Sequence, residues 1–150
     1  MSAKPLASLP GFVLAGQVTA LKRDCQVPPR PGAIPHKHGS GPFAALKIPP
    51  VNRGQRVFVL VHKSHVLFIG ATRTRDLNNY LMDFRTITSG NIANTGQITT
   101  CRVNAAANRL LRTSAVVLEL WYRSLAPGQG PAEKDAWIEK NGPPCWNWTS

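Results

Sequence analysis

The sequence has few acidic residues. Its 150 residues include seven Asp and Glu against 18 Lys and Arg, so the formal net charge is +11 and the isoelectric point is near 10.5. Such an excess favours a polyanionic partner, nucleic acid before an acidic membrane, over a charge that only aids solubility. No amphipathic membrane helix is evident. We therefore expect nucleic acid as the partner, with DNA favoured over RNA, and no membrane.

Cysteines and long apolar runs are also scarce. Three widely spaced cysteines, Cys25, Cys101 and Cys145, include no Cys-x-x-Cys pair, which argues against a disulfide framework and a zinc ribbon. No apolar run approaches the roughly 20 residues of a membrane span. We expect an intracellular protein, cytoplasmic or nucleoid-associated. The first 55 residues hold one acidic residue, Asp24, so import into an organelle stays open as an alternative.

Proline divides the chain into two parts. Nine of the 13 prolines lie in residues 1–54, where they are incompatible with helix interiors and central strands. We predict an extended, basic, Pro/Gly-rich arm over residues 1–54 and one folded domain over residues 55–150. Within the arm, His36-Lys37-His38 is a lone His-x-His, which is more often solvated than bound to a metal.

The folded part is expected to begin with a β-hairpin. Residues 57–61 and 66–69 are apolar, β-branched or aromatic, and the polar residues 62–65 separate them. Runs this apolar, without alternation, indicate strands covered on both faces. His62 and His65 lie on the turn, where a solvated side chain is the default, although either could serve as a general base.

The remaining elements are predicted from periodicity and from start and stop signals. The pattern predicts helices near residues 75–83, 102–113 and 132–141, a strand over 115–122 and a loop over 85–99. The last helix has the clearest signals, with Pro131 at its start and Gly142 after its end. The order is strand, strand, helix, helix, strand, helix.

Two stretches resemble a known family. Arg56-Val57-Phe58 followed by Phe68-Ile69-Gly70 is similar to the paired strand signature of the GIY-YIG nuclease superfamily. The end of the chain, with Trp137-Ile138, Gly142-Pro143-Pro144 and Trp146-Asn147, resembles that family's closing pattern. The resemblance covers about residues 55–149. It implies an α+β fold with a small three-stranded mixed or antiparallel sheet flanked by helices, here preceded by the arm.

The resemblance also implies a chemistry. Family members cut DNA with one metal ion, two strand tyrosines, an arginine of the first helix, a glutamate of the last helix and a late asparagine. Phosphodiester hydrolysis needs an activated water and a cation on the phosphate. The residues of this sequence taken for these roles are Phe58, Phe68, Arg75, Glu133 and Asn147, of which Arg75 and Glu133 lie near the family's positions and not on them.

The match is poor at the reacting groups. Phenylalanines replace both tyrosines and lack the hydroxyl that would hold water or relay a proton. The arginine position is Tyr80 when counted from Leu77 of the first helix, and Asn78 when counted from Gly70. Neither is a cation, but Arg73, Arg75 and Arg85 are close enough in sequence to substitute.

The metal position is altered as well. Counting back from Trp137, the glutamate position is Lys134, a cation where the metal would bind. Glu133 is therefore the candidate ligand for Mg²⁺ or Mn²⁺ if the chain is catalytic, with Asp135 as the alternative. A lysine at this position favours holding a phosphate over cleaving it.

The resulting hypothesis is a nucleic-acid-binding protein on a GIY-YIG-like scaffold with weak or lost catalysis. One alternative is a divergent metal-dependent endonuclease that hydrolyses DNA phosphodiesters. A second is a structural component of a ribonucleoprotein assembly. The candidate phosphate contacts are Lys63, Arg73, Arg75, Arg102, Arg109 and Lys134.

Overall fold

The computed structural model describes residues 4–5, 9–51, 55–93, 97–113, 115–125 and 128–148. The chain is α+β and forms two compact units, each assembled from separated segments. Unit 1 comprises Met1–Val18, Ile48–Tyr80 and Val117–Ser150, and unit 2 comprises Thr19–Lys47 and Leu81–Val116. No helix in the described ranges is both long enough and apolar enough to cross a bilayer.

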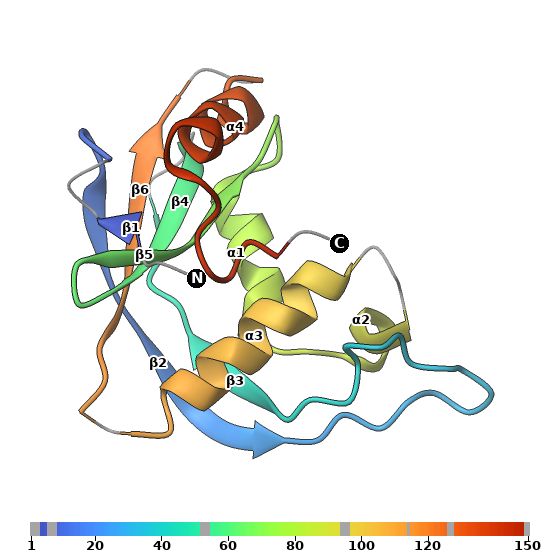
Figure 1. The fold of residues 1–150 in the computed structure, drawn as a ribbon. Coiled ribbons are helices and arrows are strands. Elements are labelled where there is room, and N and C mark those ends of the chain that lie inside the picture. The colour runs from blue at the N-terminus through green and yellow to red at the C-terminus, as the bar shows by residue number, and fades with distance from the viewer. Residues whose placement is uncertain are drawn as a thin grey trace. The chain divides into compact units, whose positions relative to one another are not determined.

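Unit 1 contains an antiparallel sheet (Figure 1). Its strands lie in the order β1-β5-β4-β6-β2, and each pairs antiparallel with its neighbours. Their bounds are β1 Lys4–Pro5, β2 Val13–Cys25, β4 Gln55–His62, β5 His65–Ala71 and β6 Leu118–Ser124. Only the first part of β2, Val13 to Val18, pairs with β6.

The predicted hairpin is confirmed. β4 and β5 pair directly from Val57↔Ala71 to His62↔His65. Lys63 and Ser64 make the two-residue turn, with φ values of 49° and 60°. Two successive positive φ values belong to a type I′ turn, whose twist matches that of the flanking strands.

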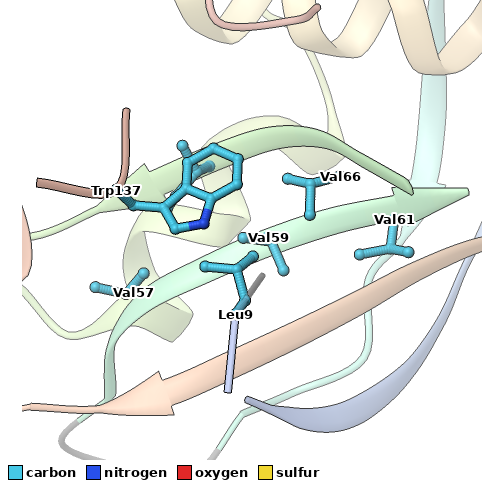
Figure 2. Packing of buried hydrophobic residues seen from close by; sticks show 7 residues of the cluster. Leu9, Val57, Val59, Val61, Val66 and Trp137 are labelled. Carbon is cyan, nitrogen blue, oxygen red and sulfur yellow. The ribbon is translucent and has the colours of Figure 1, made fainter. Parts of the chain in front are cut away.

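The core of unit 1 lies against β4 and β5. Val57, Val59 and Val61 are buried together with Ile69, and Trp137 covers them. Trp137 belongs to α4, Gly130–Asn141, which has Pro131 in its first turn and Gly142 at its C-cap, as its start and stop signals predicted. Figure 2 shows Trp137 and Leu9 beside these valines.

Unit 2 is built from the second half of β2, the strand β3 (Phe43–Lys47) and helices α2 (Ser89–Ala93) and α3 (Ile98–Leu110). β2 and β3 pair antiparallel from Thr19↔Lys47 to Cys25↔Phe43. α3 packs on β3 and on α2, and the buried cluster holds Phe43, Ile87, Ile92 and Cys101. α1, Leu77–Arg85, begins in unit 1 and ends in unit 2.

The three-stranded sheet and the Pro-rich arm are not confirmed. β1, β2 and β3 all come from the first 54 residues, and β2 alone has 13 residues. None of the nine prolines of this part lies in β2 or β3, and seven of them are in residues 26–42 and 49–50. Proline therefore ends these strands rather than keeping the segment extended. The boundary that we expected between the arm and the folded domain, after residue 54, adjoins residues 52–54, which lie outside the described residues.

The loop predicted over residues 85–99 is wrong in part, because it contains α2 and the start of α3. Thr88 and Asn91 form reciprocal bonds at the start of α2. The backbone N–H of Thr88 donates to Asn91 Oδ1 over 2.8 Å, and that of Asn91 donates to Thr88 Oγ1 over 3.3 Å. This arrangement is a capping box in which Asn takes the place of Glu or Gln.

Candidate nucleic-acid interface

The two phenylalanines at the family's tyrosine positions are core residues. Phe58 on β4 and Phe68 on β5 are 1% and 2% exposed, and their ring centroids lie 5.8 Å apart. Tyr80 of α1 meets Phe58 edge-on with centroids 6.0 Å apart. The rings form an aromatic cluster, Phe58-Phe68-Tyr80, whose packing stabilises unit 1 and leaves the two phenylalanines almost without solvent contact.

Gly70 makes room for this cluster. It pairs with Phe58 across the hairpin, and a Cβ at this position would lie 2.4 Å from the Phe58 ring. Real side-chain atoms do not approach so closely, so only glycine fits against the ring. The second glycine of the motif therefore has a packing role in this chain.

Arg75 lies beside the aromatic cluster, on the exposed loop before α1. Its guanidinium carbon is 5.9 Å from the centroid of the Tyr80 ring, and Nη2 donates to the carbonyl oxygen of Asn79 over 2.9 Å. This is a cation–π contact. Arg73 is also exposed, two residues earlier on the same loop. Arg73 and Arg75 are thus two exposed cations on the loop before α1, and Arg75 contacts Tyr80, one of the two expected arginine positions.

Asn78, which with Tyr80 is a candidate for the arginine position, has a structural role. Its side chain accepts from the backbone N–H of Val51 over 2.9 Å and donates to the carbonyl of Val51 over 2.7 Å. An amide side chain that bonds both backbone groups of one residue acts like a short neighbouring strand. It ties the start of α1 to the segment before β4.

Glu133 is paired with a cation. Arg123 Nη1 on β6 lies 2.6 Å from Glu133 Oε1 on α4. The neighbouring Lys134 is half-buried and Asp135 is exposed. Within the described ranges, no three His, Cys, Asp or Glu side chains gather closely enough to hold a metal ion.

The Arg123–Glu133 pair lines a pocket of about 230 Å³ in unit 1. Its other walls are apolar, aromatic and basic, formed by Leu9, Pro10, Phe12, Ala136, Trp137, Lys140 and Asn141. Within this pocket, the charges of Arg123 and Glu133 oppose each other.

Asn147 lies beside β5 and bonds one of its residues. Its Oδ1 accepts from the N–H of Ile69 over 2.8 Å, and its Nδ2 donates to the carbonyl of Ile69 over 2.8 Å. The N–H of Trp146 adds a bond to the carbonyl of Leu67 over 2.8 Å. Among the described residues, β1 pairs with Val66 and His65, and the bonds from Asn147 and Trp146 give partners to backbone groups further along β5.

The hairpin turn carries the remaining unit 1 candidates. Lys63 and His65 are exposed. His62 Nδ1 lies 2.9 Å from the carbonyl oxygen of Val117; a carbonyl only accepts, so this nitrogen carries the hydrogen. The turn therefore presents Lys63 as an exposed cation, and one nitrogen of His62 is engaged in holding the start of β6.

Unit 2 carries Arg102 and Arg109 on α3. Arg109 is exposed and Arg102 is half-buried; burial lowers the pKa of the Arg102 guanidinium below its ordinary value. Residues seven apart lie two turns along one face of a helix, about 10 Å from each other. The two arginines therefore form one basic line along α3.

Other cations of unit 2 hold the end of α3. Arg23 Nη1 donates to the carbonyls of Leu111 and Arg112, over 3.0 and 2.7 Å. Asp24 Oδ1 accepts from Asn108 Nδ2 over 2.9 Å and from Arg112 over 3.0 Å. These bonds, first from Asn108 and then from Arg112, lower the pKa of the Asp24 carboxyl. The Asp24 carboxylate is thereby bound within the unit.

Sequence reasoning missed the asparagines that hold this unit together. Asn104 is fully buried; Oδ1 accepts from the N–H of Ala44 over 2.8 Å, and Nδ2 donates to the carbonyls of Ala44 and Phe84 over 2.9 and 2.8 Å. Asn108, also fully buried, accepts from the N–H of Asp24 over 2.8 Å. The available signal was an asparagine four residues from another within an alanine-rich helix, where asparagine is otherwise unfavourable.

Comparison of the chain with protein-family models, curated proteins and solved structures finds no match.

Proposed function

We propose that this chain binds nucleic acid on a GIY-YIG-like fold and does not hydrolyse it. The charge of unit 2 carries the binding part of the proposal. Its two segments contain nine Lys and Arg against two acidic residues, Asp24 and Asp83. Asp24 pairs with Arg112, which leaves eight cations of the nine and only Asp83 of the two acidic residues to oppose them. A surface with so little compensating charge attracts a phosphate backbone.

The aromatic cluster supports the absence of cleavage. Phe58 and Phe68 have no hydroxyl, and they are almost completely buried away from solvent. A general base must reach the water that it activates, directly or through one intervening molecule. Neither residue meets that requirement.

The pairing of Glu133 supports the same conclusion. A carboxylate that binds a metal offers its oxygens to the cation. One oxygen of Glu133 instead contacts Arg123 at 2.6 Å. Metal binding at Glu133 would have to displace or share that contact, at a cost in unit 1 stability.

The test combines binding with cleavage. The full chain is incubated with supercoiled plasmid and with RNA, in Mg²⁺ or Mn²⁺, and its affinity for labelled DNA and RNA is measured over a salt series. We expect no nicking and an affinity that falls steeply with salt, with a log–log slope of about 0.9 per duplex phosphate contact. A salt-insensitive affinity, or none, would overturn the proposal.

Two variants separate the alternatives. Metal-dependent cutting that is lost in Glu133→Ala or Asp135→Ala, but kept in the matched variant Glu139→Ala, would establish an endonuclease and identify its ligand. Glu139 is the control because it is an exposed carboxylate on the same helix. A strong preference for RNA over DNA of equal length would favour a role in a ribonucleoprotein assembly.

A further inference from the structure

The pocket of unit 1 is bounded on one side by a turn that contains a glycine. Gly11 has a φ of 84°, and a Cβ at this position would lie 3.7 Å from Arg123 Nε. The backbone of the turn therefore passes close to the Arg123 side chain. Leu9 belongs to the buried cluster that contains Trp137 (Figure 2), and Phe12 packs against that cluster. The core of unit 1 thus holds the apolar walls of the pocket in place.

One edge of the same pocket is polar and open to solvent. The side chains of Arg123 and Glu133, joined at 2.6 Å, are 37% and 36% exposed. A guanidinium carries several N–H donors and a carboxylate several acceptor sites, and the contact between the two side chains uses one of each. The pair therefore offers a ligand a donor directly beside an acceptor.

The size of the pocket suits one ring system. Its volume of about 230 Å³ is below the roughly 300–1,000 Å³ of pockets that bury drug-sized ligands. Apolar and aromatic walls favour contact with the faces of a flat ring. The Arg123–Glu133 edge requires polar atoms along one side of that ring. A nucleobase has both properties.

We propose that this pocket binds one unstacked guanine base of the nucleic acid, with its Watson–Crick edge against Arg123 and Glu133. The inference rests on the proposed nucleic-acid-binding function and names the base that the protein reads. Guanine carries an acceptor, O6, followed by two donors, N1–H and N2–H. Arg123 donates to O6, and the two oxygens of Glu133 accept from N1–H and N2–H while the ion pair is kept.

The two adjacent donors distinguish guanine from the other bases. On their Watson–Crick edges, adenine and cytosine each have a single amino group as donor, and thymine and uracil have a single N–H. Any of these bases would leave one oxygen of Glu133 without a hydrogen bond from the ligand. A site built around hydrogen bonds rejects a ligand that leaves its polar groups unpaired.

The proposal predicts a base preference that adds no salt dependence. Base contacts specify the sequence, whereas phosphate contacts release counterions and set the salt slope. The Arg123–Glu133 pair has no net charge, so a base bound here neutralises no phosphate. The affinity for guanine should therefore exceed that for adenine by the same factor at every salt concentration.

The experiment uses the full chain and fluorescein-labelled oligothymidines of about 16 nucleotides, which carry separated guanine, adenine or hypoxanthine bases at the same positions. Binding is followed by anisotropy over a salt series. Because a good bidentate contact discriminates between bases by about tenfold or more, we expect guanine to bind at least about tenfold tighter than adenine, with equal salt slopes. Hypoxanthine lacks the N2 amino group of guanine and should give an intermediate affinity.

Glu133→Gln and Glu139→Gln form a matched pair of variants. Glu133→Gln keeps the size of the side chain but replaces an accepting oxygen with a donating NH₂ group, so its preference for guanine over adenine should fall to about threefold or less. Glu139→Gln removes the same charge from an exposed position on the same helix, and it should keep the preference of the wild type.

The outcomes separate this inference from the function on which it rests. Absence of binding to all three oligonucleotides would overturn the proposed function itself. Binding without a preference for guanine, or with a preference that survives in Glu133→Gln or disappears in Glu139→Gln, would overturn the guanine pocket alone. If Glu133→Gln fails to fold, NMR spectra of the wild type with guanosine or adenosine monophosphate decide the question. The pocket requires guanosine monophosphate alone to shift the signals of the Gly11 amide and of Arg123 Nε–H, and equal shifts with the two nucleotides, or none, would overturn it.

Discussion

The two units carry the same number of cations but differ in acidic residues. Each contains nine Lys and Arg, whereas unit 1 has five Asp and Glu and unit 2 has two. In unit 1, Arg123 pairs with Glu133 and so contributes little net field. In unit 2, Arg112 pairs with Asp24 and likewise contributes little net field, so each unit loses one cation and one acidic residue to such a pair. The distribution of acids, more than that of bases, marks unit 2 as the stronger attractor of phosphate.

The units also share a structural device. In each, one asparagine bonds both the N–H and the carbonyl of a single strand residue: Asn104 bonds Ala44 in unit 2, and Asn147 bonds Ile69 in unit 1. The difference is burial, since Asn104 is fully buried and Asn147 is half-buried. Polar backbone groups that lose a partner are costly only where water cannot replace it.

This difference gives the largest expected effect. Asn104→Ala removes three buried hydrogen bonds of unit 2 and should lower the free energy of unfolding by about 3–5 kcal/mol. Asn147→Ala, the matched change in unit 1, should cost about 1–2 kcal/mol, because Asn147 is half-buried and water can partly take the place of its side chain. Urea unfolding followed by circular dichroism measures both. Equal losses at the two positions would contradict the role given to burial.

The elements with strong local signals could be predicted from the sequence. The hairpin of β4 and β5 is confirmed, because β-branched runs around a short polar turn leave few alternatives. α4 is confirmed with its start and end signals, Pro131 and Gly142. α3 begins at Ile98 rather than Arg102, and no side-chain cap in the sequence marks that start.

What could not be predicted depends on contacts between distant segments. β2 lies in a segment whose prolines indicate an extended arm, but its pairing with β6 and β3 outweighs that composition. The pairing of Glu133 with Arg123 joins residues of a strand and a helix, which spacing along the chain does not reveal. The same holds for the aromatic cluster, where the sequence shows that a hydroxyl is missing but not that the rings are buried.

The second effect concerns the fit of Gly70 in unit 1. Gly70→Ala places a methyl group 2.4 Å from the ring of Phe58, which is buried and cannot move freely, so we expect a loss of about 2–3 kcal/mol. Gly90 of unit 2 is the control, because an added Cβ would meet neighbours only at 3.6 Å and beyond. Gly90→Ala should be neutral or slightly stabilising, since alanine favours helix. Thermal unfolding compares the two, and a neutral Gly70→Ala would show that the ring has space to move.

The smallest effect tests the charge comparison directly. Two double variants each remove two exposed cations: Lys37→Gln with Arg109→Gln in unit 2, and Lys63→Gln with Lys140→Gln in unit 1. Net charge falls equally in both, so a response to total charge alone would weaken DNA binding equally. If unit 2 holds the backbone, its variant should lose about 1 kcal/mol or more and flatten the salt slope by up to about 1.4 on single strands, and the unit 1 variant should change little. A larger loss from Lys63 and Lys140 would move the interface to unit 1, where the hairpin turn would then be the principal contact.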